Sequence, residues 1–255
     1  MVEAILELRG VTKRFAFDAT AVTALAEAGL RVEKGEFVCL IGPSGCGKST
    51  LLRLVAGFET ASEGEVLMWT KPVRGPGPDR GMVFQDYGLF PWLTVKQNIG
   101  FGPAARGLSR PEVKDISERF VEMVGLTRFA DAYPHQLSGG MKQRVAIARV
   151  LANDAEIVLM DEPFGALDAM TRAALQGELT RIWTETRKTI LFITHDIEEA
   201  VALATRVAVM TRGPGGTLKA VIPVDLPYPR DRTSDGFMQV FRAVHAQIHA
   251  EIHGA

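Results

Sequence analysis

A glycine-rich loop spans residues 42–49 of this 255-residue chain, with the sequence Gly-Pro-Ser-Gly-Cys-Gly-Lys-Ser. An apolar run over residues 37–41 leads into the loop, and residues 49–56 follow it with helical spacing up to a glycine stop at Gly57. Glycines let backbone N–H groups approach phosphates closely, and the N-terminus of the following helix faces them with its positive dipole end. The pattern therefore predicts a strand, a phosphate-binding loop and a helix that together hold a nucleotide triphosphate.

Two side chains at the end of the loop complete this interpretation. Lys48 supplies a cation for the phosphates, and Ser49 supplies a hydroxyl ligand for magnesium. The alternative, an ordinary glycine-rich turn, explains neither the lysine nor the helix that follows.

Composition and charge exclude several classes of function. Hydrophobic residues make up 47% of the chain and the net charge is −1, so nucleic acid is not the expected partner. The longest apolar stretch, residues 200–210, is too short to span a bilayer, and the N-terminus lacks the pattern of a signal peptide. The two cysteines, Cys39 in an apolar strand and Cys46 in the loop, are not expected to form a disulfide. We therefore expect a cytoplasmic protein of one large or two small domains.

Apolar runs and helical patterns alternate along the chain. Residues 81–84, 156–160 and 189–193 are apolar enough to be buried strands, and residues 170–186 form a helix between the last two. Buried strands that alternate with helices predict an α/β fold with a parallel sheet covered on both faces.

Other segments predict additions to this core. Short β-rich runs at residues 5–8, 30–32 and 64–69 indicate a small antiparallel layer. Residues 91–148 turn helical and more polar, with one amphipathic helix at 111–124, and indicate a helical insertion. A proline-rich stretch after residue 223 and a helix from about Ser234 close the chain.

An acidic pair, Asp161 and Glu162, ends the apolar strand at 156–160. A carboxylate at the C-terminal edge of such a strand, beside a phosphate loop, is what a magnesium nucleotide site requires. Asp161 is the expected magnesium ligand, and Glu162 is the expected base that orients or deprotonates the attacking water. The alternative is a surface acidic pair at the end of a strand.

A second glycine pair precedes another helical stretch. Ser138, Gly139 and Gly140 stand before residues 142–149, so a small polar residue and bare backbone amides again precede a helix start. The segment is a second candidate anion site. Taken alone, the signal is weak, because Ser-Gly-Gly is also the sequence of an ordinary helix cap and turn.

Together these segments resemble the ATP-binding cassette of ABC transporters, and the resemblance covers most of the chain in the expected order. It implies a P-loop NTPase (RecA-like) core with an antiparallel β subdomain and an inserted α-helical subdomain, the ABC ATPase fold, with ATP and Mg²⁺ as cofactors. The residues it implies around the nucleotide are Phe15, Gly42, Pro43, Ser44, Gly45, Cys46, Gly47, Lys48, Ser49, Thr50, Ser138, Gly139, Gly140 and Asp168. It implies Ser49, Gln85 and Asp161 as metal ligands, and Glu162, His195 and Gln85 as catalytic residues.

Each motif of the resemblance has its counterpart here. Gln85 matches the Q-loop glutamine, residues 137–141 match the signature, and Asp168 matches the D-loop. His195 matches the switch histidine that contacts the terminal phosphate. In such dimers, Ser138 and Gly140 of one chain close over the nucleotide held by Lys48 of the other, so the resemblance implies a homodimer.

The resemblance also assigns an aromatic residue to the adenine. Phe15 occupies the place of the aromatic that stacks on the base, where tyrosine or tryptophan is more usual. Phe17 is the alternative.

The loop after Gln85 is unusually apolar and aromatic. In ABC importers the region that matches residues 86–99 lines the groove for a coupling helix of the membrane subunit, and exposed apolar patches usually mark interaction surfaces. The alternative is that Phe90 and Trp92 pack the helical insertion onto the core. The sequences of residues 77–92, 164–172 and 225–232 are similar to those of the nitrate, sulfonate and taurine import group.

That similarity implies an import ATPase for a small anionic solute, although the solute itself is selected by other chains. The implied partners are two transmembrane permease subunits and a periplasmic or lipid-anchored solute-binding protein, with the chain peripheral at the cytoplasmic face of the inner membrane. The alternatives are a cytosolic ABC ATPase not coupled to transport and an exporter cassette.

The expected domains follow the motifs. Residues 1–90 and 149–225 form the nucleotide-binding core with its antiparallel β subdomain, residues 91–148 form the helical subdomain with the signature, and residues 226–255 form the proline-rich segment and final helix.

Two smaller features carry open alternatives. His245, His249 and His253 recur every four residues on the final helix, a spacing that suits a transition metal but is better explained by a solvated stripe. Cys46 lies near a helix N-terminus and Lys48, which favours a lowered pKa and a reactive thiol. A small residue that only fills the loop explains it equally well.

Overall fold

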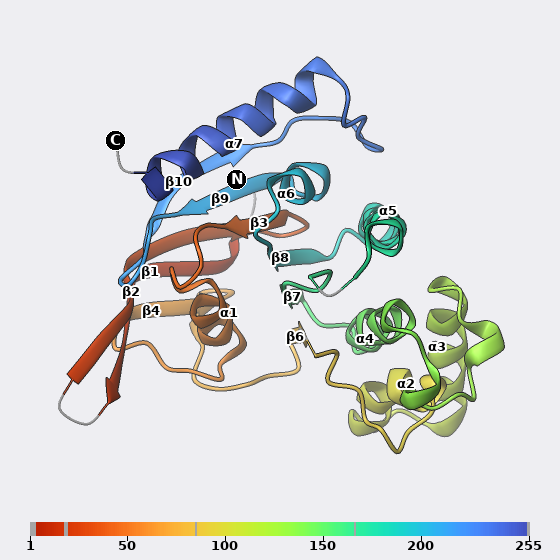
Figure 1. Cartoon of the computed structure of the whole chain (residues 1–255). Coiled ribbons are helices and arrows are strands. Elements are labelled where there is room, and N and C mark those ends of the chain that lie inside the picture. Colours follow the sequence, from red (N-terminus) through yellow and green to blue (C-terminus); the bar gives the residue numbers. More distant parts are fainter. Residues whose placement is uncertain (1–3, 18–19, 85, 166, 254–255) are drawn as a thin grey trace. The chain divides into compact units, whose positions relative to one another are not determined.

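In the computed structural model, which describes residues 4–17, 20–84, 86–165 and 167–253, the chain divides into two units. Unit 1 comprises residues 1–77 and 186–255, and unit 2 comprises residues 78–185. Figure 1 shows their elements. The domain limits expected from the sequence follow motifs, whereas these units follow packing, and those limits stay a prediction.

Unit 1 contains an antiparallel sheet built on a long hairpin. Strands β1 (Ala4–Phe17) and β2 (Thr20–Glu33) pair along their length, and β4 (Glu63–Met68) and β5 (Lys71–Pro72) extend the sheet in the order β2-β1-β4-β5. The expected antiparallel layer is confirmed. The strands are longer than the apolar runs suggested, because the inner half of the hairpin holds its buried residues, whereas residues 13–16 and 21–24 of the outer half are half-buried or exposed.

A second sheet of unit 1 carries the phosphate loop. Strand β3 (Phe37–Ile41) lies between β8 (Thr189–Ile193) and β9 (Arg206–Met210), all parallel, and β10 (Leu218–Pro223) pairs antiparallel with β9. All residues of β3 and β8 are buried, which explains their continuous apolar sequences.

Three helices belong to unit 1. Helix α1 (Lys48–Ala56) follows the loop, α6 (Ile197–Leu203) follows β8, and α7 (Asp235–His253) lies along β9 and β10 (Figure 1). The C-terminal segment is tied to the end of α6, because Arg230 Nη1 donates to the carbonyls of Val201 and Ala204, at 2.6 Å each.

Unit 2 combines a parallel strand pair with a group of helices. Strands β6 (Arg80–Val83) and β7 (Ile157–Asp161) pair in parallel. Helices α2 (Val95–Ala105), α3 (Arg110–Met123) and α4 (Gly139–Ala152) pack on one another, and α5 (Ala169–Thr186) completes the helices (Figure 1). Short 3-10 turns, η1 (Thr127–Phe129) and η2 (Pro134–Gln136), connect α3 to α4.

The expected helical stretch before residue 148 is confirmed, and α3 shows why it begins where it does. The Ser109 hydroxyl accepts from Glu112 N, and the Glu112 carboxylate accepts from Ser109 N at 2.8 Å, a complete capping box. Among the residues that the structure describes, no helix has both the length and the apolar character needed to cross a membrane.

Candidate functional site

The phosphate loop of unit 1 has a backbone that only glycine adopts easily. Gly47 has φ +98°, and a Cβ there would lie 2.5 Å from the Ala24 carbonyl oxygen and 2.6 Å from Leu25 Cδ2. Because an L-residue is strained at this φ and the neighbours leave no space, the loop needs this glycine. Its close packing against β2 holds the start of α1 in place.

The N-terminus of α1 is left open by the chain. Gly47 is its N-cap, no side chain caps it, and no acidic residue stands in its first turn. The first N–H groups of a helix have no partner within the helix, and the dipole makes them attractive to an anion. This arrangement fits phosphate groups.

Lys48 is turned into the loop instead of out to water. Its side chain is buried, and Nζ donates to the carbonyls of Gly42 at 2.8 Å and Pro43 at 3.0 Å. The loop is thereby closed around a cation beside the open helix start. The following residues, Ser49 and Thr50, are half-buried in the first turn of α1.

A glycine-rich turn after β9 packs against the phosphate loop and supports it. A Cβ on Gly213 would lie 2.3 Å from the Gly45 carbonyl oxygen, and one on Gly216 would lie 2.2 Å from the Cys46 carbonyl oxygen. This role was not predicted from the sequence. The signal was the run at residues 213–216, Gly-Pro-Gly-Gly, which by itself indicates only a turn.

His195 lies in unit 1, on a segment far from the phosphate loop in sequence. It follows β8, and Asp196 holds the next turn by accepting from the N–H groups of Glu198 and Glu199 to cap α6. His195 lines one pocket together with Gly42, Pro43 and Ser44 of the loop. The structure therefore brings together two motifs that lie 150 residues apart in the sequence.

Phe15 lies on the hairpin of unit 1. Its ring is half-buried, and Lys13 Nζ lies over it at 4.8 Å from the ring centroid. Lys13 is held by Glu59, at 2.8 Å, so the cation has a fixed position on the ring. The side chain of Phe17, the alternative, lies outside the described residues, and the adenine contact stays a prediction.

For Cys46, the structure favours the second of the two interpretations, a residue that fills the loop. It is fully buried, and burial raises its pKa above the ordinary value of 9.0, although Lys48 acts in the opposite direction. Its Sγ lies 4.0 Å from Met210 Sδ and 3.9 Å from Lys48 Nζ. Desolvation outweighs the nearby cation, so Cys46 is a packing residue of the loop.

In unit 2, the acidic pair stands at the end of β7 as expected. Asp161 is the last residue of the strand and half-buried, and Glu162 follows with φ +44°. A non-glycine residue at positive φ is costly, and such strain gathers at functional sites. The turn is closed by Gly165 N, which donates to the Glu162 carbonyl at 3.1 Å. Since this pair and the phosphate loop belong to different units, their meeting stays a prediction.

The second glycine pair begins α4 in unit 2. The Ser138 hydroxyl caps this helix by accepting from Met141 N at 3.3 Å. A Cβ on Gly139 would lie 3.2 Å from Tyr87 Oη, and one on Gly140 would lie 2.6 Å from Thr171 Cγ2. The glycines thus let α4 approach both the loop after Gln85 and the start of α5.

Asp168 holds the start of α5, next to that contact. Its carboxylate accepts from Thr171 N at 3.0 Å and Met170 N at 3.1 Å. The hydrogen bond from the Thr171 backbone, above all, lowers the pKa of Asp168 below its ordinary value of 3.8. The carboxylate is exposed and remains charged near neutral pH.

The loop at residues 86–92 of unit 2 is bound to the far end of α4. Arg149 Nη1 donates to the Gly88 carbonyl at 2.7 Å, Nη2 donates to that of Tyr87 at 3.3 Å, and the guanidinium lies 5.4 Å from the Phe90 ring. Burial lowers the pKa of Arg149 from its ordinary value. One helix therefore joins the signature segment to this aromatic loop.

Three aromatic rings form a surface beside the loop. Phe90 lies 5.6 Å from Trp92 and 4.4 Å from Phe101, measured between ring centroids. Trp92 is 69% exposed and Phe101 is 47% exposed. The interpretation that these rings only pack the insertion onto the core does not account for this exposure.

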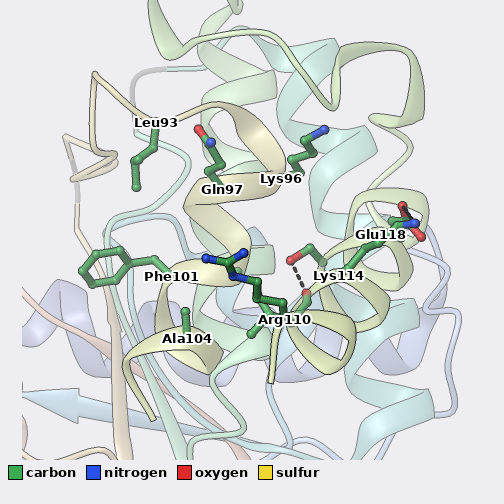
Figure 2. A pocket seen from close by; sticks show the side chains of 11 residues that line it. Leu93, Lys96, Gln97, Phe101, Ala104, Arg110, Lys114 and Glu118 are labelled. Atoms are coloured by element: carbon green, nitrogen blue, oxygen red, sulfur yellow. Dashed lines mark hydrogen bonds and ion pairs between the residues drawn. The ribbon is translucent and has the colours of Figure 1, made fainter. Parts of the chain in front are cut away.

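A pocket of about 510 Å³ opens between α2 and α3 next to these rings (Figure 2). Its apolar floor includes Leu93 and Ala104, and Lys96, Arg110 and Lys114 stand around it. Lys96 pairs with Asp131 at 2.5 Å, and Lys114 lies 3.8 Å from Glu118. The helices are close there, because a Cβ on Gly100 would lie 2.5 Å from Ser117 Oγ.

Some predicted positions cannot be placed. Gln85, expected as both metal ligand and catalytic residue, lies outside the described residues. His245 and His249 line the pocket with the phosphate loop, while the His253 side chain lies outside the described part. No group of three or more metal-ligating side chains is found among the described residues.

A family model described as ABC transporter matches residues 25–165. The chain is 53% identical, over 92% of its length and 87% of the relative, to an uncharacterized ABC transporter ATP-binding protein of Methanocaldococcus jannaschii. It is 48% identical to the aliphatic sulfonates import ATP-binding protein SsuB of Bacillus licheniformis, over 94% of this chain and 92% of that one. It is also 48% identical to the nitrate import ATP-binding protein NrtD of Synechocystis, over 89% and 87%.

Solved structures of ABC proteins are also similar to this chain. A dimeric ATP-binding cassette in a post-hydrolysis state, bound to ADP and phosphate, is similar with a TM-score of 0.75 and 33% identity, over 87% of this chain and all of that one. The protein cbiO1 of Clostridium perfringens, part of the ABC transporter complex cbiONQ, is similar with a TM-score of 0.78 and 26% identity, over 97% of this chain and 98% of that one. The fold is that of an ABC ATPase, and the chain belongs to the ABC transporter family as one of its ATPases.

Proposed function

We propose that this chain is the ATP-hydrolysing subunit of an importer for a small oxyanionic solute such as nitrate or a sulfonate. The observation that carries the nucleotide part is the open start of α1 with Lys48 turned into the loop. The import part is supported by the relatives named for sulfonate and nitrate import, at 48% identity.

The phosphate loop holds the nucleotide in this proposal. Backbone N–H groups of residues 44–50 and Lys48 Nζ bind the phosphates, and Phe15 stacks on the base. Ser49, Gln85 and Asp161 hold Mg²⁺, whose oxygen preference their side chains suit. When bound, the ion neutralises charge that develops on the phosphates.

Glu162 and His195 act on the reacting end. Glu162 orients the attacking water and accepts its proton. The positive φ of Glu162 supports this role, because the role requires one fixed direction of the carboxylate. His195 donates to the terminal phosphate from its place beside the loop.

The second half of each site comes from a second copy of the chain. Ser138, Gly139 and Gly140 of the partner, with Asp168 at the neighbouring turn, close over the nucleotide. Contacts to the terminal phosphate exist only in the closed dimer, so ATP favours closure and hydrolysis favours opening. A similar solved cassette is a dimer with ADP and phosphate.

The aromatic surface and the pocket of Figure 2 receive the membrane permease. An apolar floor with Lys96, Arg110 and Lys114 around it suits a permease helix with an apolar face and acidic side chains. The chain then works peripherally, on the cytoplasmic face of the membrane, with a solute-binding protein outside. Arg149 transmits movement of α4 to this surface through the carbonyls of Tyr87 and Gly88.

The exchange Glu162→Gln tests the ATPase part. We expect ATP binding to persist, turnover to fall at least about 100-fold, and a dimer to accumulate with ATP in light scattering. Glu156→Gln, the same exchange at an exposed residue just before β7, is the control. Normal turnover in Glu162→Gln refutes the base assignment.

A second experiment tests the transport part. The tagged chain is purified from detergent-treated membranes, and a multi-spanning membrane protein is expected with it. Trp92→Asp should lose that protein, whereas Phe129→Asp, at an aromatic residue 42% exposed on another part of unit 2, should retain it. Purification without any membrane protein favours the cytosolic alternative. Uptake of labelled nitrate and alkanesulfonates then identifies the solute.

A further inference from the structure

The pocket beside the phosphate loop has a second wall that the nucleotide site does not use. It measures about 660 Å³ and is lined on one side by Gly42, Pro43 and Ser44, with His195. On the other side stand Arg212, after β9, and one face of α7 with His245, Ile248 and His249. None of the residues of this second wall belongs to the motif set.

Helix α7 is held firmly on unit 1. Phe237 and Val244 are buried beneath it. Near its end, the Glu251 carboxylate accepts from Arg212 N at 2.9 Å and pairs with Lys219 at 2.6 Å. The second wall therefore has a fixed position relative to the loop.

The side chains that carry nitrogen donors lie next to one another on this wall. The His245 ring stacks on Phe241, with 6.1 Å between centroids, and the His249 ring follows at 5.8 Å from His245. His245 and His249 are one helical turn apart, so both rings face the same pocket. Arg212 adds a permanent cation with a planar set of donors.

Acidic residues on the neighbouring segments have partners outside the pocket lining. None of the described residues that line it is acidic. Asp196 caps α6, Glu198 pairs with Arg232 at 2.5 Å, and Glu251 pairs with Lys219. The lining thus brings together the side chains of Arg212, His195, His245 and His249 and the Ser44 hydroxyl, with no acidic residue among its described members.

We infer that this pocket binds a small oxyanion, held by Arg212, His245 and His249, next to the nucleotide. Charged and imidazole donors that converge on one cavity bind such anions by charge-assisted hydrogen bonds. The anion has two sources, phosphate leaving after hydrolysis or the oxyanionic solute. The first needs only the ATPase, and the second rests on the proposed import function.

The full-length chain, saturated with ADP so that the phosphate loop is filled, is titrated by calorimetry with phosphate, sulfate, methanesulfonate and nitrate, and with chloride as the reference. We expect at least one oxyanion to bind clearly above chloride. The pocket variants Arg212→Ala and His245→Ala/His249→Ala should each weaken it about tenfold or more.

Matched controls remove the same groups elsewhere. Arg242→Ala removes an exposed arginine of α7 that does not line the pocket, and His135→Ala removes an exposed histidine of unit 2. Both should bind the anion as wild type does, and ADP affinity in every variant confirms that the loop is folded.

Three results overturn the inference: no oxyanion binding above chloride, equal binding in the pocket variants, or an equal loss in the controls. Preference for phosphate assigns the site to the product. Preference for sulfate, methanesulfonate or nitrate assigns it to the solute. Either preference, lost in the pocket variants, supports the site.

Discussion

The phosphate loop and the signature segment are both glycine-rich helix starts, yet the chain treats them differently. The start of α1 has a glycine cap, no side-chain hydrogen bond and a buried lysine turned toward it. The start of α4 is capped by its own Ser138 hydroxyl, and its glycines contact other parts of unit 2. The first is built to receive an anion, and the second is largely satisfied without one.

This difference explains why the start of α1 can bind an anion within a single chain, whereas the start of α4 cannot. Open N–H groups with a cation nearby form a site within a single chain. A helix start that is already capped adds little until another molecule presents a ligand to it, which is consistent with its proposed role across a dimer.

The largest expected effect separates the two glycine sets. Gly47→Ala should destabilise the chain by about 2–4 kcal/mol and remove nucleotide binding, because of its positive φ and the 2.5 Å approach to the Ala24 carbonyl. Gly139→Ala should change stability by less than about 1 kcal/mol, since the nearest atom is a tyrosine hydroxyl at 3.2 Å. Urea denaturation measures both. Similar losses in the two variants would contradict the comparison.

Replacing the lysines near the two helix starts should also have different effects on ATP binding. Lys48→Ala should weaken ATP binding to the isolated chain about 10- to 100-fold, because charge-assisted hydrogen bonds to phosphate are lost. Lys142→Ala, at the corresponding first turn of α4, should leave that affinity as it is. Fluorescent nucleotide titration gives the values, and equal weakening would show that only net charge matters.

The cap itself gives a smaller effect. Ser138→Ala should cost about 1 kcal/mol of stability, the usual value for a lost helix cap, with no change in ATP binding to a single chain. Its proposed contact lies across the dimer, so the ATP-induced dimer of Glu162→Gln should weaken. A single-chain affinity that falls with Ser138→Ala would place the segment in the same site as Lys48.

The smallest effect concerns Asp168. Hydrogen bonds from Thr171 and Met170 hold its pKa below 3.8, so its stabilisation of α5 is present above that pH and is lost as pH falls through the lowered pKa. The stability difference between wild type and Asp168→Ala should therefore shrink below about pH 4. A difference that stays constant from pH 7 to pH 3 speaks against this role.

Local patterns predicted the elements that one short segment specifies. The buried strands β3 and β8 were evident from continuous apolar residues, and α3 from the apolar residues on one of its faces. The sequence did not show where α6 ends and β9 begins within residues 200–210, because the end of α6 and the residues of β9 after Arg206 are apolar and periodicity does not divide them.

Site chemistry shows the same limit. The proximity of Cys46 to a helix start and to Lys48 favoured a lowered pKa, but burial raises it, and burial depends on Met210 and other residues distant in sequence. The support of the loop by Gly213 and Gly216 likewise follows from packing against a segment 170 residues away along the chain.

The sequence alone determined the phosphate loop, the acidic pair at the end of β7 and the family resemblance, because these depend on residue types at fixed short spacings. Tertiary structure decided that α1 is open while α4 is capped, that Cys46 is buried with a raised pKa, and that His195, Arg212 and α7 share a pocket with the loop. These features arise where buried strands bring distant segments together, and no local pattern encodes that packing.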